Sequence, residues 1–209
     1  MPFFHILWTM EIVTVCGLTY SDFVIGCLAE IERADLLVLS FGAVEIVDFK
    51  KEIKRDDGVF VDLCTLSYDM NCAVLCGADT DVYGIRHKSV IIADRGQLLD
   101  VSDMVNAPES YDAGKAYRSY KTSAGNLGVI VDGDIMRAES AKAAALNKAD
   151  MIVNISDKDI DNKQILAARA AALFNNVPAL LCARNYSLLS DVHGEVKFAS
   201  KAAVNIWTV

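Results

Sequence analysis

The sequence predicts a single α/β domain over residues 1–209, in which a two-layered sandwich of β-sheets is flanked by helices. Apolar strand-like runs alternate with helical patterns, and no linker rich in Pro, Gly or Ser divides the chain. Hydrophobic residues make up 53% of the chain, which is enough for a sizeable core. The pattern of a helical segment, Ala-Asp, an apolar strand and Ser occurs twice, at 29–40 and 145–156. This echo favours two related halves, with coincidence as the alternative because helix-to-strand joins are common.

In the first half of the chain, helical and strand-like patterns follow one another. A first strand is expected within 5–15. Residues 21–34 carry apolar side chains at helical spacing, with Ser21 or Asp22 as the N-cap. The remaining expected elements are a buried strand at 35–41, a polar helix within 47–57, a helix at 59–70, a strand at 72–79, and a hairpin within 88–104 that turns at Arg95-Gly96.

The second half of the chain repeats the alternation. Residues 137–149 are rich in Ala and predict a helix, and a second helix is expected at 161–176, where Pro178 marks its end. The expected strands are an edge strand at 116–122, strands at 126–131, 150–156 and 179–185, and a closing hairpin at 187–200 that turns at His193-Gly194.

Composition narrows the possible classes of function. The net charge of −8 argues against a general nucleic-acid-binding protein, which would normally have a basic face. No apolar run reaches the roughly 18 residues that span a bilayer, so no membrane partner is expected. The start, MPFFHILWTME, lacks the basic residues and the cleavage site of a signal peptide. The six cysteines lie mostly in apolar stretches, which predicts buried, reduced thiols in a cytoplasmic protein with no metal or other cofactor.

The stretch GVIVDGDIMRAE at 128–139 has the form of a catalytic segment. An apolar run that reads as a buried strand stops at Asp132-Gly133-Asp134, and a helix-forming segment follows. A strand, an abrupt polar turn and a helix are where α/β enzymes often place a reactive residue. Asp132 is an unusual residue for that role.

This stretch belongs to a longer resemblance, which runs in order from about residue 28 to residue 200. Residues 127–156 resemble the nucleophile segment of the nitrilase, or carbon-nitrogen hydrolase, superfamily, with matches at Gly128, Asp134, Arg137, Glu139, Ala149 and Asp150. Further segments that resemble motifs of this family are 34–41, 87–104, 108–114, 169–185 and 193–200. The resemblance implies the family's α-β-β-α sandwich, which commonly pairs into an α-β-β-α-α-β-β-α dimer through the helices around 137–176.

The resemblance also implies a catalytic set that this chain does not carry. In the family a Cys attacks a nitrile or amide carbon, a Glu is the general base, a Lys stabilises the tetrahedral intermediate, and a second Glu helps to hold the Lys and the substrate. The aligned residues here are Asp132, Phe41 and Asp103 at the Cys, base and Lys positions, and Glu109 matches the second Glu. Asp134, Arg137 and Glu139 are expected to support the turn and the start of the helix.

These departures predict a homologue that does not hydrolyse carbon-nitrogen bonds. Loss of nucleophile, base and cation together removes the terms that supply most of the barrier reduction. Asp103, Asp132 and Glu109, if close together, would form an anionic pocket that binds an amine or a cation. A solvated relic pocket is the simpler alternative. We therefore expect a non-catalytic binder of a small molecule or a protein, and a homodimer. The alternatives are a hydrolase with altered residues, or another activity.

Overall fold

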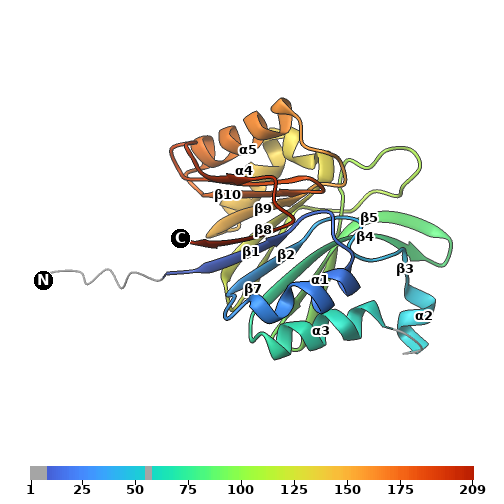
Figure 1. Cartoon of the computed structure of the whole chain (residues 1–209). Helices are drawn as coiled ribbons and strands as arrows, with labels where there is room; N and C mark the ends of the chain where they lie inside the picture. Colours follow the sequence, from blue (N-terminus) through green and yellow to red (C-terminus); the bar gives the residue numbers. More distant parts are fainter. Residues whose placement is uncertain (1–8, 55–57) are drawn as a thin grey trace, which may run out of the picture.

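The computed structural model describes residues 9–54 and 58–209, and in it two β-sheets face each other between outer layers of helices (Figure 1). The predicted α-β-β-α sandwich is confirmed. Residues 5–8 of the expected first strand and the end of the polar helix, at 55–57, lie outside the described residues. No helix within the described ranges is long and apolar enough to cross a membrane.

The first sheet has the strand order β13-β1-β2-β4-β5-β6, with β3 paired to β4. Its strands β1, β2 and β4 are parallel, and β5, β6 and β13 run antiparallel to their neighbours. The bounds of these strands are β1 (Glu11–Val15), β2 (Leu36–Leu39), β3 (Val47–Asp48), β4 (Ala73–Val82), β5 (Ile85–Asp94), β6 (Gln97–Asp103) and β13 (Val204–Thr208).

The second sheet has the order β12-β11-β10-β9-β8-β7, again with a parallel centre, here β8, β9 and β10. The bounds are β7 (Arg118–Thr122), β8 (Gly125–Val131), β9 (Met151–Ile155), β10 (Ala179–Ala183), β11 (Tyr186–Ser190) and β12 (Val196–Ser200). The echo in the sequence corresponds to β2 and β9, and each of these is the middle strand of a parallel trio. The strand at 116–122 lies at the edge of the sheet, as predicted.

The helices form the outer layers (Figure 1). Helices α1 (Tyr20–Gly26) and α3 (Val59–Asp69) pack on the first sheet, and α4 (Ala138–Leu146) and α5 (Asn162–Asn175) pack on the second. A third apolar cluster fills the space between the sheets. Within residues 9–54 and 58–209, the remaining helices are the short α2 (Phe49–Lys54) and two 3-10 helices, η1 (Leu28–Glu30) and η2 (Asp132–Met136).

Three expectations need correction. The helix predicted at 21–34 ends at Gly26 and continues as η1, because Ile31 has an extended backbone and is buried against the first sheet. Its N-cap is Thr19, whose hydroxyl accepts from the backbone N–H of Asp22. Strand β13 was not predicted at all; it pairs with β1 over its whole length, from Glu11 opposite Thr208 to Val15 opposite Val204.

Candidate functional site

The candidate site lies where the parallel strands of both sheets end. Phe41 follows β2, Asp132 follows β8, Asp157 follows β9, and Arg184 follows β10. Residues at the carboxyl ends of parallel strands are the usual site-forming positions in open α/β sheets. The fold thus gathers side chains from four separate segments at one end of the sandwich.

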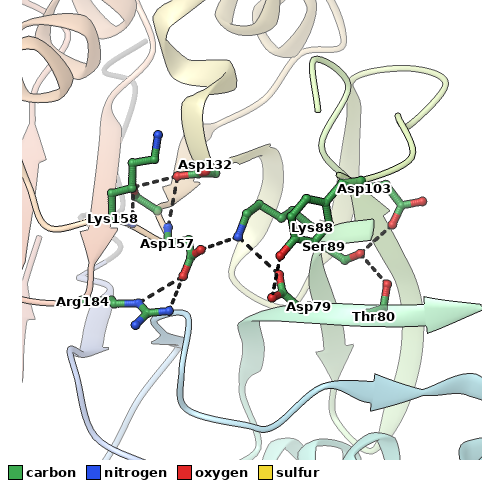
Figure 2. A network of polar contacts seen from close by, with 11 residues as sticks. Asp79, Thr80, Lys88, Ser89, Asp103, Asp132, Asp157, Lys158 and Arg184 are labelled. Carbon is green, nitrogen blue, oxygen red and sulfur yellow. Dashed lines mark hydrogen bonds and ion pairs between the residues drawn. The ribbon is translucent and has the colours of Figure 1, made fainter. Parts of the chain in front are cut away.

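Lys88 on β5 is the centre of this group. Its ammonium donates to Asp157 and to Asp79 of β4, with 3.3 Å between Nζ and the Asp79 Oδ1 (Figure 2). It also lies over two aromatic rings, 5.1 Å from the centroid of Phe41 and 4.9 Å from that of Tyr111. Lys88 is only 6% exposed. Two carboxylates and two rings therefore surround a buried ammonium, as in sites that recognise amines.

The charges in this group hold one another in their ionised forms. Burial disfavours the charged Lys88, but the hydrogen bond and charge of Asp157 and the charge of Asp79 outweigh it and raise the pKa of Lys88. Burial opposes the charge of Asp157 as well, yet hydrogen bonds from Lys88 and Arg184 lower its pKa. Arg184 donates through two nitrogens to the Oδ1 of Asp157. The ammonium at the centre is thus protonated at neutral pH and has no lone pair for nucleophilic attack.

Asp79 and Tyr111 complete the surroundings of the ammonium. The Tyr111 hydroxyl donates to the Oδ2 of Asp79 over 3.0 Å, and burial together with this bond raises the pKa of Tyr111. Tyr111 comes from the loop between β6 and β7, and it lies two residues after Glu109. Glu109 itself is exposed on this loop. The loop therefore contributes a phenol ring to the group around Lys88.

Phe41 is packed tightly on the side of the first sheet. It is 2% exposed, and a methyl group on Gly77 of β4 would come within 2.6 Å of its ring and 2.9 Å of Ile155. A Gly at this position is thus needed for the ring to lie between the two sheets. Phe41 offers no proton acceptor at the position where the family resemblance implies a general base.

Asp132 has the backbone expected of a reactive turn. Its φ of 45° lies in the left-handed region, which is costly for a residue with a side chain. Asn154 of β9 holds the turn by donating to the backbone carbonyls of Ile130 and Asp132 at 3.1 and 3.0 Å. The Asp132 Oδ1 accepts from the Ser156 hydroxyl and from the backbone N–H of Asp157, at 3.1 and 3.2 Å. The carboxylate is thus bonded to the protein and 3% exposed.

Asp103 has different partners. Its Oδ1 accepts from the Ser89 hydroxyl at 2.7 Å, and His87 lies 3.7 Å from its Oδ2. Figure 2 shows the Asp103 carboxylate turned toward Ser89 and Thr80, whereas the Lys88 ammonium extends in the other direction toward Asp157. No hydrogen bond in the described residues joins Asp103 to Asp132. Neighbouring strand residues point to opposite faces, so Lys88 and Ser89 separate these two environments.

The three residues expected to support the turn lie around it in different ways. Asp134 is 1% exposed and accepts from the backbone N–H groups of Val105 and Asn106, at 2.6 and 3.0 Å. It therefore anchors the loop after β6 to η2. Arg137 is the N-cap residue of α4, with no side-chain capping bond, and Glu139 lies in the first turn of that helix. Both line a groove between α4 and α5.

The thiols of the chain lie apart from this group. All six cysteines are described and unpaired, and none is hydrogen-bonded to Lys88, Asp132 or Asp157. Across residues 9–54 and 58–209, no cluster of three or more His, Cys, Asp or Glu side chains is arranged to hold a metal ion. The polar groups that meet at the site are carboxylates, a protonated amine, a guanidinium and the Tyr111 hydroxyl.

Five members of the group were not predicted from the sequence: Asp79, Lys88, Tyr111, Asp157 and Arg184. The sequence carries a usable signal for Asp157 and Arg184. Arg184 directly follows an apolar run that forms a parallel strand, and Asp157 comes two residues after the end of another. The sequence signal for Lys88 is weaker: it is the charged residue that begins the buried run KSVIIA. The partnership between Lys88 and Asp157 depends on how the two sheets face each other, which no local pattern shows.

Comparison with known structures identifies the fold. A carbon-nitrogen hydrolase from Helicobacter pylori superposes with a TM-score of 0.77 at 14% identity, over 96% of this chain and 88% of that one. A branch 10 member of the nitrilase superfamily from Saccharomyces cerevisiae gives 0.79 at 16% identity, over 96% and 89%. The chain has the nitrilase fold.

An amidase of the nitrilase superfamily from Nesterenkonia superposes as well, with a TM-score of 0.78 at 15% identity, over 96% of this chain and 89% of the amidase. Another structure of that amidase shows covalent addition of an acetamide moiety at its active-site cysteine. No protein-family model and no curated protein matches the sequence of this nitrilase-fold chain. The similarity to these solved structures is therefore a similarity of fold, and this fold is the one that the resemblance of the motifs predicts.

Proposed function

We propose that this nitrilase-fold chain is a homologue that has lost carbon-nitrogen hydrolysis and acts as a non-catalytic binding protein. The observation that carries the proposal is the ion pair of Lys88 with Asp157, beside Asp132 at the turn where the family has its nucleophile. A thiol forms a labile acyl intermediate readily, whereas attack by a carboxylate gives a mixed anhydride and must expel a poor leaving group. The charges of Lys88, Asp157 and Arg184 neutralise one another within the chain.

The binding function is proposed to lie outside this group. The sequence predicts an anionic pocket for an amine or a cation formed by Asp103, Asp132 and Glu109. The carboxylates that surround a cation are instead those of Asp79 and Asp157. Lys88, however, supplies the ammonium from within the chain. A ligand amine would have to displace a buried, doubly paired side chain. We therefore favour a surface partner over a small molecule at this position.

The partner that the surface favours is a second copy of the chain. A groove of about 540 Å³ runs between η2, α4 and α5, and its lining is mostly apolar, with Met136 and the 81% exposed Phe174 at its sides. Arg137, Glu139 and Lys142 also line it. In a two-fold pair, the basic residues of each copy can face the Glu139 of the other, which is the self-complementarity that an isologous interface needs. This supports the homodimer implied by the family resemblance.

Turnover assays test the loss of catalysis. The purified chain is incubated with a panel of amides, nitriles and carbamoyl compounds, and released ammonia is measured, with an amidase that uses an active-site cysteine as the positive control. No release above the buffer rate is expected. Release that disappears in Asp132→Ala and persists in the neighbouring exposed variant Lys158→Ala would instead establish a hydrolase that works with altered residues. A cytoplasmic location stays a prediction from the thiols.

A further inference from the structure

Two buried cysteines face each other across the interface between the sheets. Cys16 directly follows β1 in the first sheet, and Cys182 lies on β10 in the second. Their sulfur atoms are 3.9 Å apart although the residues are 166 positions apart in the chain. The Cys182 thiol also lies against the backbone carbonyls of Val15 and Val38, at 3.8 and 3.9 Å. Its side chain is therefore directed into the first sheet.

The backbones approach unusually closely at this point. Facing sheets normally lie about 10 Å apart, too far for one disulfide to join them without a local approach. Next to Cys16, Gly17 has a φ of 70°, and a methyl group there would lie 2.6 Å from the carbonyl oxygen of Arg184. Gly17 and Arg184 are thus nearly in contact through their backbones. From this approach the two sulfur atoms need to move by only about 2 Å to reach bonding distance.

Hydrogen bonding shifts the pKa values of the two thiols in opposite directions. The Ser187 hydroxyl oxygen accepts from Thr14 and from Asn205, at 2.9 and 3.1 Å, which uses its acceptor positions and leaves its hydrogen for Cys16. The hydrogen bond from Cys182 is the main cause that lowers the pKa of Cys16, against burial, with a further contribution from Ser187. The same bond and burial raise the pKa of Cys182. Cys16 faces the Ser187 hydroxyl and is 4% exposed, against 0% for Cys182, so Cys16 is the thiol that reacts first and Cys182 is the one that resolves.

We propose that Cys16 and Cys182 form a redox-sensitive site at which a peroxide joins the two sheets through a disulfide. The Cys16 thiolate attacks one peroxide oxygen, the O–O bond breaks, and Cys16 becomes a sulfenic acid. The hydroxide that leaves combines with the proton that Cys16 gave up, forming the first molecule of water. The Cys182 sulfur then attacks the Cys16 sulfur, forming the S–S bond and breaking the S–O bond. The proton from Cys182 combines with the departing hydroxide. In total, two thiols and one hydrogen peroxide give one disulfide and two molecules of water.

Oxidation of the full chain, followed by mass spectrometry, tests the site. The reduced protein is treated with hydrogen peroxide, unfolded in an alkylating reagent and digested without reductant. The expected product is a linked pair of peptides containing Cys16 and Cys182, lighter by two hydrogens than the separate peptides and split by reductant. Because the cross-link closes a long loop, Tm should rise by roughly 5–10 °C. Recovery of both residues as alkylated thiols, as sulfinic acids, or linked to other cysteines would overturn the proposal.

Two serine variants separate the roles of the thiols. In Cys182→Ser, the sulfenic acid on Cys16 has no resolving partner, so a dimedone adduct should appear at Cys16. Cys64→Ser removes a partly exposed thiol far from the pair in the sequence, and the Cys16–Cys182 cross-link should form in it as in the unmodified protein. Loss of the cross-link in Cys64→Ser would count against the assignment. The measurement on the unmodified chain decides the matter even where a variant does not fold.

Discussion

Lys88 and Asp157 come from different sheets of the sandwich, and their side chains form a partly buried ion pair between them. Lys88 belongs to β5 of the first sheet, and Asp157 follows β9 of the second. Arg184, which follows β10, adds a second cation to the same carboxylate. In a nitrilase fold the reactive residues are expected at this end of the sandwich. In this chain, the ion pair at this end joins the two sheets.

Replacing Lys88 should destabilise the fold. In Lys88→Met the apolar stem is kept but the ammonium is lost, so Asp79 has no cation and Asp157 keeps only Arg184. Breaking a partly buried pair in this way should lower the free energy of unfolding by roughly 2–4 kcal/mol, measured by urea unfolding. Lys158→Met changes an exposed neighbour of Asp157 and should shift it by less than about 0.5 kcal/mol. Equal effects of the two variants would contradict the structural role of Lys88.

The same ion pair predicts how stability depends on pH. The pKa of Asp157 is lower in the folded state, so its contribution is present above the unfolded value of about 4 and is lost as pH falls through the folded pKa. The pKa of Lys88 is raised, so its contribution is present below about 10.4 and is lost as pH rises through the folded pKa. Urea midpoints measured between pH 2 and 7 should fall less steeply in Asp157→Asn than in the unmodified chain. The exposed variant Asp159→Asn should keep the original slope; a common slope for all three would refute the assignment.

A small amine should restore what Lys88→Ala removes. The atoms lost in this variant correspond to propylammonium, and the two carboxylates and two rings that surrounded Lys88 remain. Millimolar propylammonium should raise the Tm of Lys88→Ala by a few degrees through binding to the folded state. The unmodified chain, whose site is filled, and 1-propanol, which has the shape without the charge, are the controls. A similar shift in the unmodified chain would mean that the amine binds elsewhere.

A charge in the groove between α4 and α5 should separate the proposed dimer. Phe174→Glu places a carboxylate at the exposed apolar side of the groove, which Glu139 also lines. Sedimentation equilibrium should show a dimer for the unmodified chain and a dissociation constant at least about tenfold higher for the variant. Ile25→Glu changes an equally exposed apolar residue on α1, on the outer face of the other sheet, and should leave the dimer intact. A monomeric unmodified chain would reject the interface.

Local sequence patterns predict much of the fold, but they do not predict the group of residues around Lys88. Apolar runs such as that of β9 and the capping box formed by Asp161 and Gln164 at the start of α5 are encoded over a few residues. Strand β13 was missed because it is a short segment whose pairing with β1 joins opposite ends of the sequence. Lys88 was missed for a related reason. A charged residue becomes buried only when its partners arrive from the other sheet, and Asp157 is 69 residues away along the chain.

The pairing of β13 with β1 also sets the order in which the molecule can be completed. Strand β1 is among the first parts of the domain to leave the ribosome, and β13 is among the last. Until residues 204–208 have been synthesised, β1 presents an open row of backbone amides and carbonyls that can pair with another nascent chain. The first sheet is therefore completed only after all strands of the second sheet have been translated, and one edge of β1 stays open to pairing with another chain until then.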